Sequence, residues 1–353
     1  MKILVTGGTG FTGKALVRRL LRAGHEVVAL DYKEGHKTEE IRAWGAELVL
    51  GSVTDPAVVR QCMRGVDVVQ HVAAAFREMN VPRSHYEAVN VEGTRNTLQA
   101  ALEAGVRKFV YTSTCGVHGN VDHPPADETA PIQPADYYQQ TKYEAEPIVL
   151  DYCARGLDAT ILRPAAIYGP GDPGRFRMIF QQVEQGWFPI FGNGRTLYHP
   201  LYIDNFLDAL QLAMEPGKGS GQAYLIADEQ YIAIEGLVRR AAAALGRPVR
   251  LFRLPIWPVV AAGHVVETVC KPLRIPPPLH PRRVDWYRQN RAFKIDKAER
   301  ELGYRPTVGL DDGLQRTAAW YRREGMLSGS AGSSPQAPPC PLPQSNSARK
   351  PPG

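Results

Sequence analysis

Tyr138 and Lys142 stand four residues apart in the segment Tyr138-Gln139-Gln140-Thr141-Lys142. Residues with this spacing lie on the same face of a helix. A phenol has an ordinary pKa of about 10, so it needs help to act as a base near neutral pH, and a neighbouring ammonium favours the phenolate. The pair is therefore a candidate general acid/base, although any long helix can contain the same spacing.

A glycine-rich turn near the N-terminus gives this pair a chemical context. An apolar run over residues 1–6 predicts a strand, and apolar periodicity over residues 14–24 predicts a helix. Gly7, Gly10 and Gly13 lie between them. Glycines allow the sharp turn and let a pyrophosphate approach the free N–H groups at the start of the helix. Strand, turn and helix together predict a dinucleotide site.

Asp31 ends a second apolar segment, residues 25–30, and follows Gly13 by eighteen residues. A carboxylate at this distance accepts the hydroxyls of the adenosine ribose and repels a 2′-phosphate, so NAD is favoured over NADP. Lys33 and Lys37 lie nearby and weaken that preference. The alternative is an ordinary glycine-rich loop with a surface Asp. A dinucleotide site combined with the Tyr–Lys pair indicates hydride chemistry on a carbon that bears oxygen.

Apolar strands alternate with helical stretches as far as about residue 165. This alternation predicts a Rossmann-type, doubly wound α/β fold, with a parallel sheet covered by helices on both faces. Tyr138 and Lys142 fall on the last of these helices. The expected strands are 47–50, 66–71, 108–112 and 159–162, and the expected helices are 56–63, 91–104 and 136–155.

Several segments, in this order, resemble the extended short-chain dehydrogenases/reductases, in the group of NAD-dependent epimerases/dehydratases and 3β-hydroxysteroid dehydrogenases. The resemblance covers roughly residues 1–325. Its motifs are Gly7-x-x-Gly10-x-x-Gly13, Asp31, His71-Val72-Ala73-Ala74, Asn90-Val91-Glu92-Gly93-Thr94, Tyr111-Thr112-Ser113-Thr114-Cys115-Gly116-Val117-His118-Gly119, Tyr138-x-x-x-Lys142, Leu162-Arg163-Pro164 and Ile167-Tyr168-Gly169-Pro170-Gly171.

The resemblance implies that Tyr138 and Lys142 are catalytic and that a Ser or Thr orients the substrate oxygen. Matching the family segment places this role on Thr114, with Ser113 as the alternative. Strand alternation points these two side chains to opposite faces, so one of them is expected to serve. His118 stands where the family usually has Tyr, and we expect it to line the cleft rather than transfer a proton.

The resemblance also implies NAD as the cofactor and a set of residues around it. Asn90 would pack near the nicotinamide, or it could cap a helix. Ser52 stands where the family often has an acidic residue, so the adenine contact lacks a charge. The cofactor-binding residues implied are Gly7, Gly10, Phe11, Thr12, Gly13, Asp31, Ser52, Val53, Ala73, Asn90, Tyr138, Lys142 and Pro164.

The expected domains are interleaved. Residues 1–170 form the NAD-binding domain, to which 201–227 return, whereas 171–200 and 228–325 form a smaller substrate-binding lobe. Residues 327–353 are rich in Ser, Gly and Pro, a composition that predicts a disordered tail. The resemblance also implies that helices 91–104 and 136–155 pair across a homodimer axis. Ala100, Ala101 and Ala104 would allow close approach there, and the alternative is that they only pack inside one subunit.

Composition excludes several classes of function. The chain has 353 residues, 42 basic and 36 acidic, for a net charge of +6. The basic residues are dispersed, so nucleic-acid binding is not expected. The five cysteines, at 62, 115, 153, 270 and 340, have no metal-type or redox-type spacing, so no metal is expected. With no signal peptide recognised before the first strand, these features indicate a cytoplasmic protein.

The substrate class stays open between two enzymes and one non-enzyme. Nucleotide-sugar enzymes often have Asn where this chain has Ala166, and Arg-Asp where it has Tyr198 and His199. Arg175, Arg177 and Arg195 could replace these anchors. Apolar residues 254–267 are too short to span a bilayer; they predict a helix over the pocket, a lid or a shallow membrane contact. Together with three prolines at 276–278 they favour a dehydrogenase or ketone reductase for a less polar, steroid-like or hydroxyacyl substrate. A non-catalytic NAD-binding homologue is the third possibility.

Overall fold

A seven-stranded parallel sheet forms the centre of the computed structural model, which describes residues 1–35, 38–76, 81–258, 261 and 286–328. Every neighbouring pair in this sheet is parallel. The strand order is β11 (Ala223–Ile226), β6 (Ala159–Pro164), β5 (Lys108–Thr112), β4 (Val68–His71), β1 (Lys2–Thr6), β2 (Glu26–Asp31) and β3 (Glu47–Leu50). The predicted Rossmann-type, doubly wound fold is confirmed.

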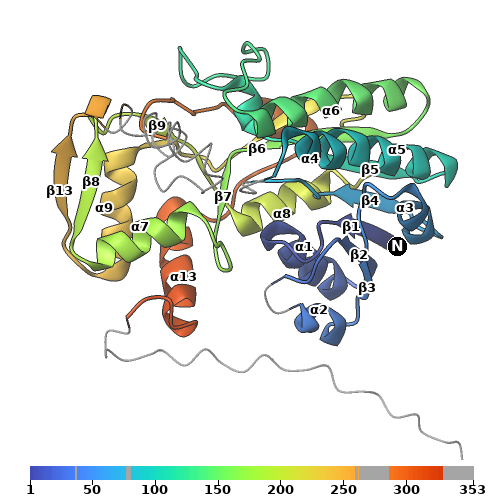
Figure 1. The fold of residues 1–353 in the computed structure, drawn as a ribbon, viewed down its shortest axis with the longest axis horizontal. Helices are drawn as coiled ribbons and strands as arrows, with labels where there is room; N and C mark the ends of the chain where they lie inside the picture. Colours follow the sequence, from blue (N-terminus) through green and yellow to red (C-terminus); the bar gives the residue numbers. More distant parts are fainter. Residues whose placement is uncertain (36–37, 77–80, 259–260, 262–285, 329–353) are drawn as a thin grey trace, which may run out of the picture.

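Helices cover both faces of this sheet, as Figure 1 shows. Successive strand residues point to opposite faces, so Ile3 and Val5 join one apolar core while Leu4 joins the other. The first core packs against α1 (Phe11–Arg22) and α8 (Ile203–Leu212), with α2 (Glu39–Ala43) beside α1. The second packs against α3 (Pro56–Cys62), α5 (Gly93–Glu103) and α6 (Tyr137–Ala154). Burial on both faces explains why the strand sequences are almost continuously apolar.

Two of these helices begin in ways that matter for the site. Asp136 caps α6, because its carboxylate accepts a hydrogen bond from the backbone N–H of Gln139 at 2.9 Å. The short helix α4 (Arg83–Glu87) leads into a π-helical turn, η1 (Ala88–Glu92), which runs directly into α5. Asn90 lies inside this π-helical turn, so the alternative expectation of Asn90 as a helix N-cap is wrong.

A second group of elements lies at the left of Figure 1. It contains α7 (Arg175–Glu184), α9 (Ile234–Leu245) and the parallel pair β8 (Trp187–Phe191) and β13 (Arg250–Leu254). Helix α13 (Leu310–Arg323) packs on α9, whereas α12 (Asp296–Leu302) contacts β11. Two small pairs join the groups: β7 (Ala166–Tyr168) with β10 (Pro200–Tyr202), and β9 (Leu197–Tyr198) with β12 (Ile232–Ala233).

Two sequence-based expectations need correction. Ala100 and Ala101 are buried inside the subunit, at 3% and 0% exposure, because they pack in the core beneath α5 and cannot meet a partner. Leu327 is buried as well, at 5% exposure, and the backbone of Ser328 donates to Glu184. Residues 327 and 328 therefore belong to the folded part of the chain, contrary to the expected start of the tail at 327.

Other expectations fall outside the described residues. These are Lys37, the prolines at 276–278, most of the apolar segment 254–267, and residues 329–353. Within the part of the chain that is described, no helix is long and apolar enough to cross a membrane.

Candidate active site

Tyr138 and Lys142 lie one turn apart on α6, as their spacing predicts. Tyr138 is half-buried, and its ring lies 4.8 Å from that of Phe76, centroid to centroid. Phe76 follows β4 and is 50% exposed. Lys142 is only 1% exposed. The phenol can thus meet a ligand from outside, whereas the lysine side chain lies in the protein interior.

The Lys142 ammonium is the most unusual polar group of the site. Its Nζ atom is buried and has no hydrogen-bond partner among the described residues. Burial lowers its pKa to about 7, although the nearby Glu146 carboxylate opposes that change. Buried polar groups are nearly always satisfied, so an unpartnered Nζ indicates that its acceptors come from a bound ligand.

Ser113 and Thr114 follow β5 and point to different partners. The hydroxyl of Ser113 is buried and donates to Oε1 of Glu146 at 2.5 Å. Thr114 is half-buried; its Oγ1 accepts the backbone N–H of Gly116 at 3.0 Å and so caps a 3-10 turn, η2 (Cys115–His118). The Ser113 hydroxyl is therefore already hydrogen-bonded within the protein interior, which leaves Thr114 as the better candidate to contact substrate.

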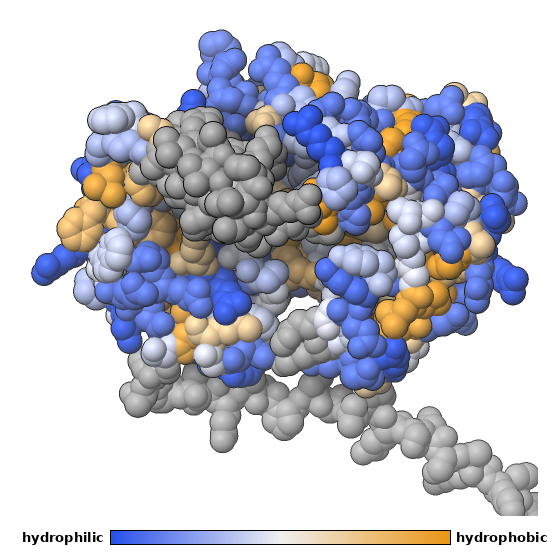
Figure 2. Space-filling model, in the orientation of Figure 1, coloured by the Kyte–Doolittle hydropathy of each residue, from blue (hydrophilic) through white to orange (hydrophobic). Residues whose placement is uncertain are grey.

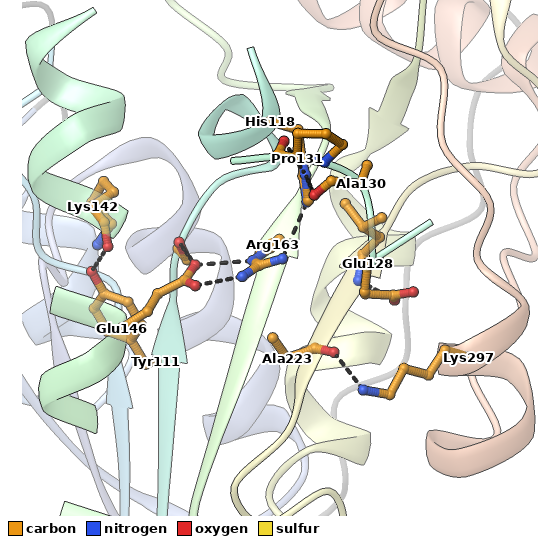
Figure 3. A network of polar contacts seen from close by, with 12 residues as sticks. Tyr111, His118, Glu128, Ala130, Pro131, Lys142, Glu146, Arg163, Ala223 and Lys297 are labelled. Carbon is orange, nitrogen blue, oxygen red and sulfur yellow. Dashed lines mark hydrogen bonds and ion pairs between the residues drawn. The ribbon is translucent and has the colours of Figure 1, made fainter. Parts of the chain in front are cut away.

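Glu146 anchors a buried network that sequence reasoning missed (Figure 3). Arg163 of β6 donates two hydrogen bonds to the Glu146 carboxylate. One runs from Nε to Oε1 at 3.0 Å and the other from a terminal nitrogen to Oε2 at 2.6 Å. Both side chains are under 10% exposed. Glu146 stands four residues beyond Lys142, on the same helix face, and this spacing is the signal that could have revealed it.

His118 completes this network as a neutral side chain. Arg163 donates to Nε2 of His118 at 3.1 Å, and a guanidinium cannot accept, so the proton must sit on Nδ1. Nδ1 then donates to the carbonyl of Ala130 at 3.1 Å. Burial and the charge of Arg163 lower the pKa of His118. With both nitrogens engaged, His118 positions its neighbours and has no free atom for proton transfer.

Asn90 connects the loop after β4 to helix α6. Its side-chain oxygen accepts the backbone N–H of Ala75 at 2.8 Å, and its amide donates to the Thr141 hydroxyl at 2.9 Å. Thr141 is the neighbour of Lys142, so Asn90 fixes α6 against the loop that ends near Phe76. Asn90 therefore positions the walls of the site.

The glycine-rich turn forms a cradle of closely spaced backbone, in which a Cβ atom at some positions would clash. Gly7 has a φ of +72°, and a Cβ on Gly13 would lie only 2.0 Å from the carbonyl oxygen of Gly7. Helix α1 starts next to this turn, and no described side chain caps it. Its first N–H groups and positive dipole end therefore face the turn, the arrangement that binds a pyrophosphate.

Asp31 ends β2 beside this cradle. Its carboxylate accepts the backbone N–H and the hydroxyl of Thr9, at 3.0 and 2.8 Å. Asp31 thereby fixes the loop and keeps a partly exposed negative charge at its rim. Phe11, the first residue of α1, lies within 3.4 Å of the place where Gly171 would carry a Cβ.

The remaining expected cofactor residues follow the carboxyl ends of sheet strands, where doubly wound folds bind ligands. Ser52 comes after β3, and its hydroxyl bonds to that of Thr54 at 2.8 Å. Val53 is buried beside it, against Gly93. Ala73 follows β4 and contacts Gly7. Pro164 is the last residue of β6.

These features fit NAD. The cradle suits a pyrophosphate, the Asp31 carboxylate suits ribose hydroxyls, and the unpartnered Lys142 Nζ suits the second ribose. Within the described ranges, no group of three or more His, Cys, Asp and Glu residues could hold a metal ion.

Comparison with known proteins identifies the family. The model of the NAD dependent epimerase/dehydratase family matches residues 3–227. The chain belongs to this family. It is thus an enzyme of the extended short-chain dehydrogenase/reductase type, and its cofactor is NAD, which confirms both predictions.

Similar proteins include reductases, dehydrogenases and sugar-nucleotide enzymes. A 2-alkyl-3-oxoalkanoate reductase from Stenotrophomonas maltophilia is 33% identical over 90% of this chain and 99% of its own. A 3-beta-hydroxysteroid dehydrogenase from Mycolicibacterium neoaurum is 31% identical over 91% of each chain. A dTDP-glucose 4,6-dehydratase from Streptomyces venezuelae, solved with NAD bound, has a TM-score of 0.74 and 27% identity, covering 93% of this chain and 99% of its own.

Proposed function

We propose that this enzyme transfers hydride between NAD and a secondary alcohol or ketone in a small, fairly apolar substrate of the hydroxyacyl or 3β-hydroxysteroid type. The observation that carries the proposal is the buried, unpartnered ammonium of Lys142 one turn from the half-buried phenol of Tyr138. A purely structural lysine would not be expected to remain buried without an acceptor, because leaving such a donor unsatisfied costs about 1–3 kcal/mol.

Each residue has a distinct part in this reaction. When bound, NAD supplies the hydride acceptor for alcohol oxidation, and its reduced form supplies the donor for ketone reduction. Tyr138 takes or gives the hydroxyl proton, and Thr114 holds the substrate oxygen. Lys142 hydrogen-bonds the cofactor ribose and, as an ammonium, favours the phenolate. Asn90 holds α6 in place, while Asp31 and the glycine turn bind the far half of the cofactor.

The surroundings of two of the candidate arginines support an apolar substrate over a nucleotide sugar. Arg195 lines an open surface cavity with Glu235, Arg239 and Arg253, a lining that includes neither Arg175 nor Arg177. Arg175 instead lies over the rings of Tyr198 and Trp286. A buried diphosphate needs several cations directed at one point. The named activities of the two curated relatives also concern an oxoalkanoate and a hydroxysteroid.

A nucleotide-sugar epimerase or dehydratase is the second candidate, because a solved dTDP-glucose 4,6-dehydratase shares the fold over almost the whole chain. The family assignment rules out the non-catalytic homologue considered above. We test both candidates by incubating the enzyme with NAD and a 3-hydroxyalkanoate, a 3β-hydroxysteroid or UDP-glucose. NADH should accumulate with a hydroxyl substrate. Sugar conversion without net NADH would favour the second candidate, and no turnover of any of the three would count against both.

Assembly and surroundings complete the proposal. We propose residues 1–170 with 201–227 as the NAD-binding domain, and 171–200 with 228–325 as the substrate lobe. A homodimer would form through the outer faces of α5 and α6, where Leu150 is 43% exposed. Light scattering tests it, since a monomeric mass at micromolar protein would contradict a dimer. A cytoplasmic location is supported by free thiols at Cys62, Cys115 and Cys153.

One exposed patch supports an occasional lipid contact. Figure 2 shows hydrophobic surface at the left edge, over β8 and β13. The large apolar side chains exposed on these two strands are Trp187, Phe252 and Leu254, and Trp257, three residues after β13, is 72% exposed. Arginines 250 and 253 lie among them on β13. Aromatic and basic residues together favour a peripheral membrane surface, and flotation with anionic vesicles tests the contact.

A further inference from the structure

Arg175 is a cation without an anionic partner in a largely aromatic environment. It is the first residue of α7, it is half-buried, and no acidic side chain in the described part of the chain pairs with it. Its guanidinium carbon lies 5.0 Å from the ring centroid of Trp286 and 5.6 Å from that of Tyr198. These two rings pack edge to face, 5.9 Å apart. Cation–π contact orients the guanidinium and leaves its N–H donors available.

A second donor beside Arg175 is also unsatisfied. Trp286 is 7% exposed, and its indole N–H is buried with no hydrogen-bond partner among the described residues. A buried N–H of this kind normally finds an acceptor. The start of α7 adds nothing to this pair, because the carboxylate of Asp172 already accepts the backbone N–H of Gly174 there, at 2.7 Å. Two neighbouring donors, the guanidinium and the indole N–H, thus favour an acceptor with negative charge beside them.

We propose that Arg175 and the indole N–H of Trp286 form the binding site for a carboxylate of the substrate. This rests on the proposed function and narrows its substrate to a hydroxy or oxo acid with an apolar chain. A single guanidinium between aromatic rings matches one negative charge. A nucleotide diphosphate carries more charge. Of the two other arginines considered for it, Arg195 lines a different cavity, and Arg177 follows Arg175 by two residues on α7.

The carboxylate site lies along a chain of contacts that reaches the reacting end. Tyr198 precedes His199, whose Nδ1 accepts the backbone N–H of Phe293 at 3.2 Å. The Phe293 ring lies 5.9 Å from that of His118, in the 3-10 turn that Thr114 caps. On the other side, the loop before α7 meets the cofactor turn, where the Gly171 position contacts Phe11. A substrate held by its carboxylate at Arg175 would extend between these two walls toward Thr114 and Tyr138.

The test compares an acid with its neutral ester. Oxidation of 3-hydroxydodecanoate and of its methyl ester by the NAD-loaded enzyme is followed as NADH, giving kcat/KM for each. Wild type should prefer the acid. Arg175→Gln should lower kcat/KM for the acid by roughly 10- to 100-fold, as expected for loss of a charged hydrogen bond, and change the ester little. Arg175→Lys should recover part of the loss. Trp286→Phe should cost the acid about 3- to 10-fold, because it keeps the ring and removes only the N–H.

Arg195→Gln serves as the matched control, since Arg195 is exposed in another cavity. Equal losses for acid and ester in Arg175→Gln would show a structural role and overturn the inference, as would a wild type that does not prefer the acid. Equilibrium dialysis of dodecanoate against the NAD-loaded protein reports the carboxylate site without turnover. Dodecanoate binding that Arg175→Gln abolishes would support the site even if no hydroxy acid is oxidised, which would count against the proposed function alone. UDP-glucose binding that depends on Arg175 would assign the site to a diphosphate instead.

Discussion

The ammonium nitrogen of Lys142 lies 4.1 Å from the ring centroid of Tyr111, and the Tyr111 hydroxyl donates to the backbone carbonyl of the same lysine at 3.1 Å. Tyr111 thus holds Lys142 from two directions, through its ring and through its hydroxyl. Neither contact gives the ammonium a hydrogen-bond acceptor. The lysine is therefore held in position in the cofactor-free enzyme, and its burial without an acceptor lowers the free energy of unfolding.

This arrangement predicts that Lys142→Met stabilises the cofactor-free enzyme while removing activity. Burial lowers the pKa of Lys142 from 10.5 to about 7. Between these values the unfolded chain holds a proton that the folded chain lacks, so wild-type stability falls as pH drops from about 10 to 7. Methionine keeps the apolar stem and carries no charge. Thermal unfolding should show a gain of about 1–3 kcal/mol at pH 7 that shrinks toward pH 10.

Lys294→Met is the control for this experiment, because Lys294 is exposed. Its effect on the melting temperature should be small and nearly independent of pH. A loss of stability in Lys142→Met that is the same at pH 7 and pH 10 would contradict a buried, unsatisfied ammonium. Added NAD should raise the melting temperature of wild type more than that of Lys142→Met.

Asp31 should set the choice of cofactor. Replacing it with Asn removes the charge that repels a 2′-phosphate, so the preference for NAD over NADP should fall by about tenfold or more, a change of about 1.4 kcal/mol. Thr9→Val removes one hydrogen bond to Asp31 and keeps its charge. That variant should weaken both cofactors equally. Titration of each protein with NAD and with NADP gives the two dissociation constants. Tighter binding of NADP than of NAD by wild type would show that attraction by Lys33 exceeds repulsion by Asp31.

Glu146 and Ser113 should differ in their effect on stability. Glu146→Gln leaves the buried guanidinium of Arg163 without its carboxylate, so it should cost about 3–5 kcal/mol. Ser113→Ala removes one hydrogen bond and leaves the ion pair intact, at a cost of about 1 kcal/mol. Urea unfolding at neutral pH gives both values. Equal losses would mean that the Glu146–Arg163 pair contributes little.

Thr114 and Ser113 should also separate in catalysis. Thr114→Ala should lower kcat/KM by at least about tenfold, since one hydrogen bond to a developing charge is lost. Ser113→Ala should affect the free energy of unfolding more than kcat/KM. Steady-state rates and unfolding curves for the two variants answer the question. A larger rate loss in Ser113→Ala would move the substrate contact to Ser113.

The sequence predicted the sheet domain well because its signals are local. Strand 108–112, for example, matches β5 residue for residue, since an apolar run beside a helical period needs no long-range information. The Tyr138–Lys142 pair and the glycine turn are equally local. Their expected positions on α6 and before α1 follow from spacing alone.

The other features of the site could not be predicted, because they depend on contacts between segments that are far apart in the sequence. Nothing in the spacing of Ser113, Glu146 and Arg163 predicts their contact, because it joins β5, α6 and β6 across up to fifty residues of chain. The aromatic surroundings of Arg175 likewise come from Trp286, 111 residues away. The placement of Ala100 and Ala101 at a subunit contact was wrong, because small residues serve internal packing and subunit contact equally well.

Replacement of Tyr138 by Phe tests the proposed chemistry most directly. Phenylalanine keeps the ring that packs on Phe76 and removes only the hydroxyl. Wild type and variant would be compared for NADH formation from a hydroxyl substrate, with NAD affinity measured in parallel by titration. We predict that turnover falls by about 10²- to 10⁴-fold, as expected for loss of general acid–base catalysis, while NAD binds within about threefold of wild type. Turnover close to that of wild type would contradict the assignment of Tyr138 as the proton-transfer residue.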